Sequence, residues 1–107
     1  MVINQYDIFW VNLNPRLGHE IKKVSPCIVL SPDEMNFHID TIIIAPMTTK
    51  SRIYPTRVKI TFEKKFGWAI LDQIRTIDKI RLKEKAGHLE ETKIAEVKGI
   101  LKEMLID

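Results

Sequence analysis

Short apolar runs separated by turn residues dominate this chain, and they restrict it to a fold built from short strands. Residues 6–13 alternate with a period of two, which predicts a strand with both faces covered. The two faces of that strand carry Phe9, Val11 and Leu13 on one side and Tyr6, Ile8 and Trp10 on the other. Four further runs predict strands at residues 27–30, 41–45, 57–62 and 68–71, of which the second is expected to stop at Pro46.

The remaining segments predict one long loop, two short elements and one helix. Residues 14–25 are too rich in charge and turn residues to continue the first strand, and they are expected to form a loop. Residues 76–82 predict a short helix, and residues 83–89 a last short strand. From Thr92 onward, apolar residues recur at three- and four-residue spacing, which predicts an amphipathic helix with a poor cap and one weakening glycine, Gly99. The apolar positions of that helix are Ile94, Val97, Leu101, Met104 and Leu105.

These elements favour a mainly β fold with a C-terminal helix. Five or six short strands follow one another with no alternation of strand and helix, so we expect an antiparallel, partly closed barrel rather than a parallel α/β sheet. With 107 residues, 45% of them apolar, residues 1–107 are expected to form a single domain. A chain of this size buries only about two thirds of its unfolded surface, which makes a homodimer plausible.

Charge and cysteine content limit the compartment and the partners. Seventeen Lys and Arg against fourteen Asp and Glu give a formal charge of +3, which permits a polyanionic partner without requiring one. The single cysteine, Cys27, cannot form an internal disulfide and lies in an apolar run, so we expect a buried thiol in the reducing cytoplasm. The first residues lack the basic, apolar and small-residue pattern of a signal peptide, and the longest apolar run, residues 42–47, is far below the ~20 residues that span a bilayer, so neither export nor membrane insertion is expected.

Several kinds of catalytic chemistry lack their sequence signatures. Glycines at positions 18, 67, 87 and 99 match neither a dinucleotide fingerprint nor a phosphate-binding loop, so no nucleotide cofactor is expected. One cysteine and three histidines do not have metal-site spacing, and His38 near Asp40 is interpreted as a turn histidine. We therefore expect no metal. Because apolar residues surround Cys27, a core cysteine is preferred to a nucleophile.

Polar residues gather instead at strand ends and in the first loop. Cleavage of RNA by its own 2'-hydroxyl needs a base, an acid for the departing 5'-oxygen and donors around the phosphorus, and these side chains supply such groups without a metal. The alternative is that they are scattered surface charges and turn residues of a small barrel. The set comprises His19, Glu20, Lys22 and Lys23, then Thr48, Thr49 and Lys50, and finally Asp72, Gln73 and Arg75.

The order and spacing of short motifs resemble the MazF/PemK (Kid) family of toxin endoribonucleases from bacterial toxin-antitoxin systems. The matching stretches are Tyr6-Asp7-Ile8-Phe9-Trp10-Val11, Asn14-Pro15, Gly18-His19-Glu20, Pro26 with the strand after it and Ser31-Pro32, Asn36, Ala45-Pro46-Met47-Thr48-Thr49, Tyr54-Pro55 and Asp72-Gln73-Ile74-Arg75-Thr76-Ile77-Asp78. The resemblance implies an SH3-like barrel of five to seven strands. It also implies a homodimer that cuts single-stranded RNA at short sequences, leaving a 2',3'-cyclic phosphate and a 5'-hydroxyl, and a cognate MazE/PemI-like antitoxin.

The chain departs from the family pattern at Ser25, where the family has an arginine that acts at the scissile phosphate. A hydroxyl supplies neither the permanent charge nor the two-pronged hydrogen bonding of a guanidinium. Three explanations stand side by side. The substitution was made to inactivate a toxic protein, or Lys22 or Lys23 supplies the charge in a natural variant, or the chain binds RNA or a partner without cutting. A second departure is Ile70, where the PemK branch has an arginine, which makes Asp72 a weaker catalytic candidate than Thr48.

The resemblance assigns roles to the polar set. Thr48 is expected to contact the scissile phosphate, position 25 marks the arginine, and His19 and Glu20 are the candidate acid and base. The expected RNA-binding residues are Arg16, Lys22, Lys23, Thr49, Lys50, Asp72, Gln73 and Arg75. Two other functions are kept open: a toxin similar to CcdB that binds DNA gyrase through its C-terminal residues, and a non-catalytic RNA-binding module on the same fold.

Overall fold

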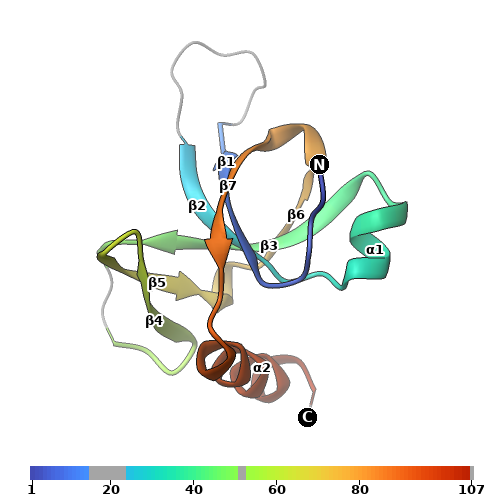
Figure 1. Cartoon of the computed structure of the whole chain (residues 1–107). Coiled ribbons are helices and arrows are strands. Elements are labelled where there is room, and N and C mark those ends of the chain that lie inside the picture. Colours follow the sequence, from blue (N-terminus) through green and yellow to red (C-terminus); the bar gives the residue numbers. More distant parts are fainter. Residues whose placement is uncertain (15–23, 51–52, 107) are drawn as a thin grey trace.

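The computed structural model describes residues 1–14, 24–50 and 53–106, and within them the chain forms a curled antiparallel sheet with a helix beneath it (Figure 1). The strands run in the order β4-β5-β3-β2-β1-β7, and β6 pairs with β3 beside this path. The strands are β1 (Asp7–Asn12), β2 (Val24–Val29), β3 (Thr41–Thr48), β4 (Arg57–Phe62), β5 (Lys65–Ile70), β6 (Arg75–Asp78) and β7 (Leu82–His88). The helices are α1 (Asp33–His38) and α2 (Glu91–Leu105), with 3-10 turns η1 (Leu71–Gln73) and η2 (Lys79–Arg81).

β1 has both faces buried, as its alternation predicts. Phe9 and Val11 belong to one core cluster with Cys27, whereas Tyr6 and Ile8 belong to a second cluster. The second cluster also contains Ile94 and Val97 of α2, so this helix closes one face of the sheet. Packing of this kind must hold α2 in place, because the Glu90 side chain makes no capping hydrogen bond among the described residues.

The prediction for α2 is confirmed except at its end. Leu101 and Met104 pack against the core, but Leu105 is exposed, as is Ile106 after the helix. No helix among residues 1–14, 24–50 and 53–106 is both long and apolar enough to span a membrane.

β3 continues through Pro46, and the expected end of the strand at that residue is wrong. β6 pairs with residues 41–44 of β3, and β5 pairs with Met47 and Thr48 on the same ladder side. Pro46 lies between the segments of β3 that pair with β6 and with β5, so no strand on this side needs the N–H that proline lacks. The strand therefore reaches Thr48 and carries that residue beyond the core.

The short helix expected at residues 76–82 is also wrong. Thr76 and Asp78 are exposed and Ile77 is buried, a period-two pattern that lets β6 pair with the free side of β3. Only η2 is helical, and the Asp78 carboxylate accepts a hydrogen bond from the backbone N–H of Ile80 at 3.0 Å to cap it. The chain consequently has seven strands in the part that the structure describes, rather than five or six.

Two smaller differences affect the region around the site. β2 begins at Val24, so Ser25 lies in a strand and not in the loop predicted over residues 14–25. β5 begins at Lys65 rather than at residue 68, and the turn before it is formed by Glu63 and Lys64, which have φ of 49° and 62°. Positive φ at both central residues is the requirement of a two-residue type I' hairpin, and Phe62 pairs with Lys65 across it. Helix α1 was not predicted at all.

Cys27 is a core residue, as its apolar neighbours predict. Its side chain is fully buried in β2, and burial raises the pKa of the thiol to about 12 against the smaller, opposing effect of the Arg75 charge. A thiol with this pKa stays protonated at neutral pH, which removes it from the candidates for a nucleophile.

Candidate active site

Ser25, Thr48 and Thr49 lie together around one pocket. This pocket has a volume of about 360 Å³ and is formed where β1, β2 and β3 meet the β4–β5 hairpin. Ser25 pairs with Val11 of β1 in register, and Pro26 pairs with Trp10. Thr48 ends β3 beside Trp68 of β5. The pocket is lined by Trp10, Ser25, Pro26, Met47, Thr48, Thr49, Phe62, Glu63, Phe66 and Gly67.

The Thr48 hydroxyl is oriented by the backbone that follows it. Its Oγ1 accepts a hydrogen bond from the Lys50 N–H at 3.2 Å and lies 3.2 Å from the Lys50 carbonyl oxygen, to which it donates. This is a local turn closed by a threonine side chain. It fixes the hydroxyl at the end of a buried strand, which is where a fixed polar group next to a bound phosphate is needed.

Three aromatic side chains form part of the pocket wall, and sequence reasoning did not assign them to the site. Trp10 and Phe62 are half-buried, with ring centroids 5.7 Å apart and planes at 56°, and Phe66 is 64% exposed. The Lys59 ammonium lies 4.3 Å from the centroid of the Phe66 ring. The available signal was Phe66, two residues after the hairpin turn, at a position where a solvated strand face would have a polar residue.

Asp72, Gln73 and Arg75 lie outside the set of described residues that line this pocket. Asp72 Oδ1 accepts hydrogen bonds from Thr56 Oγ1 at 2.9 Å and from Arg57 Nε at 3.4 Å. Burial favours a higher pKa for Asp72, but these hydrogen bonds outweigh it and lower the pKa below its usual value. The carboxylate therefore joins η1 to the start of β4. Gln73 and Arg75 are exposed.

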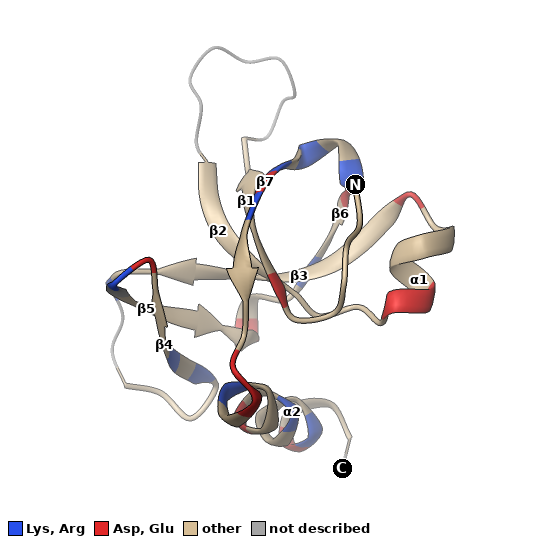
Figure 2. Cartoon of the chain, in the orientation of Figure 1, with Lys and Arg blue, Asp and Glu red and all other residues tan. Residues whose placement is uncertain are grey.

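Of the other predicted site residues, Lys50 is described by the structure and the rest are not. Arg16, His19, Glu20, Lys22 and Lys23 lie outside the described residues. Lys50 is exposed next to the pocket and contributes its backbone to the Thr48 turn. Lys and Arg residues also occur along β4 and at the β4–β5 turn (Figure 2). Among the described residues, no three His, Cys, Asp or Glu side chains are grouped to hold a metal ion.

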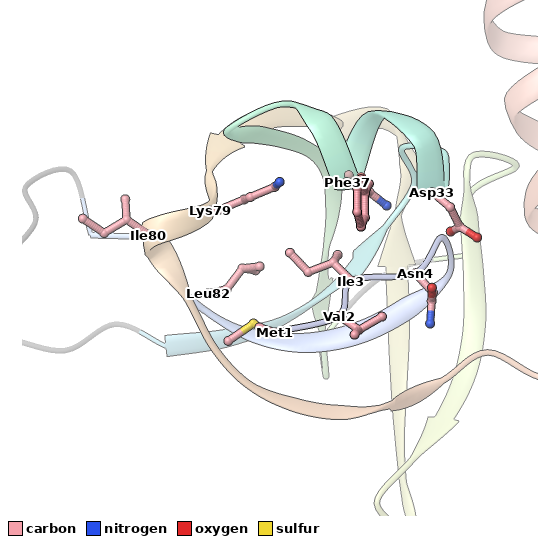
Figure 3. A pocket seen from close by; sticks show the side chains of 10 residues that line it. Met1, Val2, Ile3, Asn4, Asp33, Phe37, Lys79, Ile80 and Leu82 are labelled. Atoms are coloured by element: carbon pink, nitrogen blue, oxygen red, sulfur yellow. The ribbon is translucent and has the colours of Figure 1, made fainter.

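A larger pocket, of about 510 Å³, lies on another part of the molecule and contains none of the predicted site residues. Figure 3 shows Ile3, Phe37 and Leu82 around it, from the N-terminal segment, α1 and β7. Half of its lining residues are aliphatic, and the titratable side chains among them are Asp33 and Lys79, neither of which is a predicted site residue. Size alone does not make it the active site.

Comparisons with known proteins identify the family of this chain. A family model described as PemK-like, MazF-like toxin of type II toxin-antitoxin system matches residues 4–105. The chain belongs to this family. Endoribonuclease MazF of Staphylococcus epidermidis is 37% identical over an alignment that covers 94% of this chain and 88% of that protein.

Two solved structures from Deinococcus radiodurans show the same fold. MazF (Form-I) superposes with a TM-score of 0.81 at 28% identity, covering 98% of this chain and 97% of that one. The MazE-MazF complex (Form-II) contains a chain with a TM-score of 0.81 at 26% identity, with coverage of 98% and 96%. The resemblance found in the sequence and the mainly β fold with a C-terminal helix are confirmed.

Proposed function

We propose that this MazF/PemK toxin is a metal-independent endoribonuclease that cuts single-stranded RNA at short sequences in the cytoplasm and leaves a 2',3'-cyclic phosphate and a 5'-hydroxyl. The observation that carries the proposal is that Ser25 and Thr48, from two neighbouring strands, line one pocket with three aromatic rings. Hydroxyl donors beside flat apolar rings suit a single-stranded nucleotide, whose phosphate needs donors and whose base stacks.

The reaction divides among the residues as follows. The RNA 2'-hydroxyl loses its proton to a base and attacks the neighbouring phosphorus, and the departing 5'-oxygen receives a proton from an acid. His19 and Glu20 are proposed for these two roles. Thr48 Oγ1 donates to a phosphate oxygen, for which it exchanges its bond to the Lys50 carbonyl. Position 25 is where a guanidinium would stabilise the charge that develops on the phosphate.

The RNA backbone is proposed to contact cations around the pocket. Lys50 is exposed beside Thr48, and Arg16, Lys22 and Lys23 belong to the segment that leads into Ser25. Thr49 contributes a hydroxyl to the pocket, and Gln73 and Arg75 extend the contacts at a greater distance. Contacts of this kind lower RNA affinity as salt rises, because binding releases counterions.

Incubating the purified protein with a long mRNA in EDTA tests the activity. We expect cuts at one short sequence, with cyclic phosphate and 5'-hydroxyl ends in an end-group analysis, and the Ser25→Arg variant is run in parallel. No cutting by either protein would overturn the nuclease assignment while leaving the fold intact. Trapped gyrase–DNA complexes with intact RNA would favour the CcdB-like alternative, and RNA binding with persistent inactivity would favour a non-catalytic module.

A homodimer is proposed through the apolar surface that surrounds the larger pocket. Met1, Val2, Phe37 and Ile80 are all exposed there. Exposing this much apolar surface to water is unfavourable for a monomer unless a partner covers it. Asp33 of α1 and Lys79 of η2 line the same pocket with opposite charges. A two-fold interface is self-complementary, so each charge can meet its opposite on a second copy.

Ile80→Glu is expected to convert the dimer to a monomer at micromolar concentration in a sedimentation measurement, because it places a carboxylate in an apolar interface. Ile106→Glu is the matched control, since both isoleucines are 65% exposed but Ile106 lies outside this surface. We expect the control to sediment as the dimer. A monomeric unmodified protein, or a dimer that survives Ile80→Glu, would contradict the assignment.

The proposed antitoxin is MazE/PemI-like and masks the site with an extended acidic segment. The chain has a formal charge of +3, and Lys50 and Lys59 lie near the pocket wall. An acidic peptide can occupy this basic surface in place of RNA, which links inhibition to substrate binding.

A further inference from the structure

Arg81, a half-buried residue at the end of η2, binds the end of β1. Its Nη1 donates a hydrogen bond to the carbonyl oxygen of Asn12 at 3.2 Å and another to that of Asn14 at 2.6 Å. Asn12 and Asn14 are both buried, and Asn12 Oδ1 accepts a hydrogen bond from the Asn14 N–H at 2.9 Å. The end of β1 and the residues just after it therefore form one buried polar corner, made of Asn12, Asn14 and the Arg81 guanidinium.

This corner needs a donor from outside β1. The pairing of β1 with β7 ends at Val11 and Leu82, so Asn12 and Asn14 lie beyond that ladder. Buried carbonyl groups need a hydrogen-bond donor, because leaving one without a partner is costly. The Arg81 guanidinium supplies this donor where the ladder stops, and its planar group binds two carbonyl oxygens at once.

The backbone on both sides of Arg81 is itself held in place. Before it, the Asp78 carboxylate accepts a hydrogen bond from the Ile80 N–H at 3.0 Å and caps η2. After it, Leu82 is buried in the core cluster that also contains Val11. A side chain that starts from a fixed backbone loses less freedom when it binds, so Arg81 is suited to hold the corner rigidly.

The corner supports one wall of the candidate active-site pocket. Val11, the neighbour of Asn12, pairs with Ser25 of β2. Trp10, two residues before Asn12, lines the pocket together with Ser25. A displacement of the corner would therefore move position 25 relative to Thr48, which lies at the end of another strand.

We infer that Arg81 is a positioning residue for the cleavage reaction, an inference that rests on the proposed ribonuclease function. Its guanidinium holds the end of β1, and through the β1–β2 ladder it keeps position 25 in place relative to Thr48. Because the guanidinium is bound to the carbonyl oxygens of Asn12 and Asn14, Arg81 acts on the rate of cutting rather than on RNA affinity. Exposed cations that contact RNA phosphates act on affinity instead.

The test measures kcat and KM for cleavage of a single-stranded RNA, with each Arg81 variant made in the unmodified chain and in Ser25→Arg. We expect Arg81→Met to lower kcat at least about tenfold and to change KM less than about twofold, since misplacing a catalytic group by about 1 Å can cost about 10²-fold in rate. Arg81→Lys keeps a donor for the carbonyl oxygens and should recover part of the loss. Lys83→Met is the matched control, because it removes one positive charge from an exposed position on β7 and should leave kcat and KM unchanged.

Amide hydrogen exchange provides a readout that needs no activity. Arg81→Met is expected to speed exchange of the Asn14 N–H at least about tenfold, because the corner opens locally when its donor is lost. The Leu89 N–H, which donates to the Tyr6 carbonyl oxygen at 3.0 Å, is the internal reference and should exchange as before. Equal acceleration at Leu89 would mean general destabilisation and would overturn the positioning role.

The kinetic outcomes separate this role from its alternatives. An unchanged kcat in Arg81→Met would overturn the inference, and a higher KM at constant kcat would place Arg81 among the residues that bind RNA. If Arg81→Met sediments as a monomer while Lys83→Met stays dimeric, the effect belongs to the subunit interface and the role is also overturned. Cutting by neither the unmodified chain nor Ser25→Arg would overturn the proposed function, and the Asn14 exchange distinguishes that result from a corner that Arg81 does not hold.

Discussion

Replacing Ser25 by arginine is expected to raise the rate of RNA cleavage at least tenfold. Ser25 lies in β2, paired with Val11 and followed by Pro26, so its backbone is extended and an arginine side chain there would start from the same pocket wall. Its guanidinium would add a permanent charge and two parallel hydrogen bonds to phosphate oxygens. Loss of one such preorganised donor costs about 10²–10³ in rate, so restoring it should give a gain that an RNA cleavage assay measures directly.

Three further variants separate charge, geometry and site. Ser25→Lys supplies a point charge without the planar fork, and we expect it to recover less activity than Ser25→Arg. Thr48→Val in the Ser25→Arg background removes the hydroxyl at nearly constant volume, and we expect most of the gain to be lost. Lys22→Ala and Lys23→Ala in the unmodified chain should change RNA affinity more than rate. If Ser25→Arg leaves the rate unchanged and Lys23→Ala abolishes it, the essential charge has moved to the first loop.

Much of the fold could be predicted because local patterns agreed with tertiary packing. The alternation in β1 separates Phe9 and Val11 from Tyr6 and Ile8, and the structure places the two sets in different core clusters. The face of β4 that holds Val58 and Ile60 is buried, while Lys59 and Thr61 are exposed. In these strands, burial decides the side-chain pattern directly, so the pattern indicates the structure.

The errors occur where a neighbouring strand decides the outcome. Residues 76–82 have helix-compatible spacing, but β3 has an unpaired side that β6 completes, and ladder hydrogen bonds outweigh a weak helix preference. Pro46 would end the strand only if a neighbouring strand needed its missing N–H. The partner of β3 changes from β6 to β5 at this residue, so no hydrogen bond is lost there. Pairing partners distant in sequence leave no local signal, so neither result could be read from one segment.

The candidate site divides in the same way. Ser25 was chosen because it stands at the position of the family arginine, and Thr48 because it follows an apolar strand; the pairing of β2 with β3 brings both to one pocket. Asp72 was also chosen because it follows an apolar strand, but Thr56 and Arg57 bind its carboxylate. Trp10, Phe62 and Phe66 were missed because apolar residues in strands are expected in the core, and only the curl of the sheet shows which of them remain accessible.

Removing the carboxylate of Asp7 is expected to destabilise the protein by about 3 kcal/mol at neutral pH. The Asp7 side chain on β1 is only 4% exposed. It accepts hydrogen bonds from the Asn4 N–H at 2.8 Å, Lys85 Nζ at 3.0 Å and His88 Nδ1 at 2.8 Å. The side chains of Lys85 and His88 are 41% and 51% exposed, so each ion pair alone contributes little. The loss in Asp7→Asn comes from replacing a buried anion that all three donors share.

The same carboxylate gives the stability a defined pH dependence. Burial favours a higher pKa for Asp7, but the hydrogen bonds from Asn4, His88 and Lys85 together lower the pKa below its ordinary value of 3.8. A carboxyl whose folded pKa lies below its unfolded value stabilises the protein fully above the unfolded value. That contribution disappears as the pH falls through the folded pKa. The difference in unfolding free energy between the unmodified protein and Asp7→Asn should therefore shrink as the pH falls from about 5 to below about 4.

Urea unfolding at a series of pH values measures this difference, and Asp40→Asn provides the control. Asp40 is an exposed carboxylate before β3, so its removal should change stability by less than about 0.5 kcal/mol at any pH in the series. Other carboxyl groups titrate in the same range in all three proteins, and taking differences between variants removes their common effect. If the destabilisation by Asp7→Asn stays constant down to the lowest pH measured, the Asp7 side chain acts through packing. The hydrogen bonds of the ionised carboxylate with Lys85 and His88 would then contribute nothing.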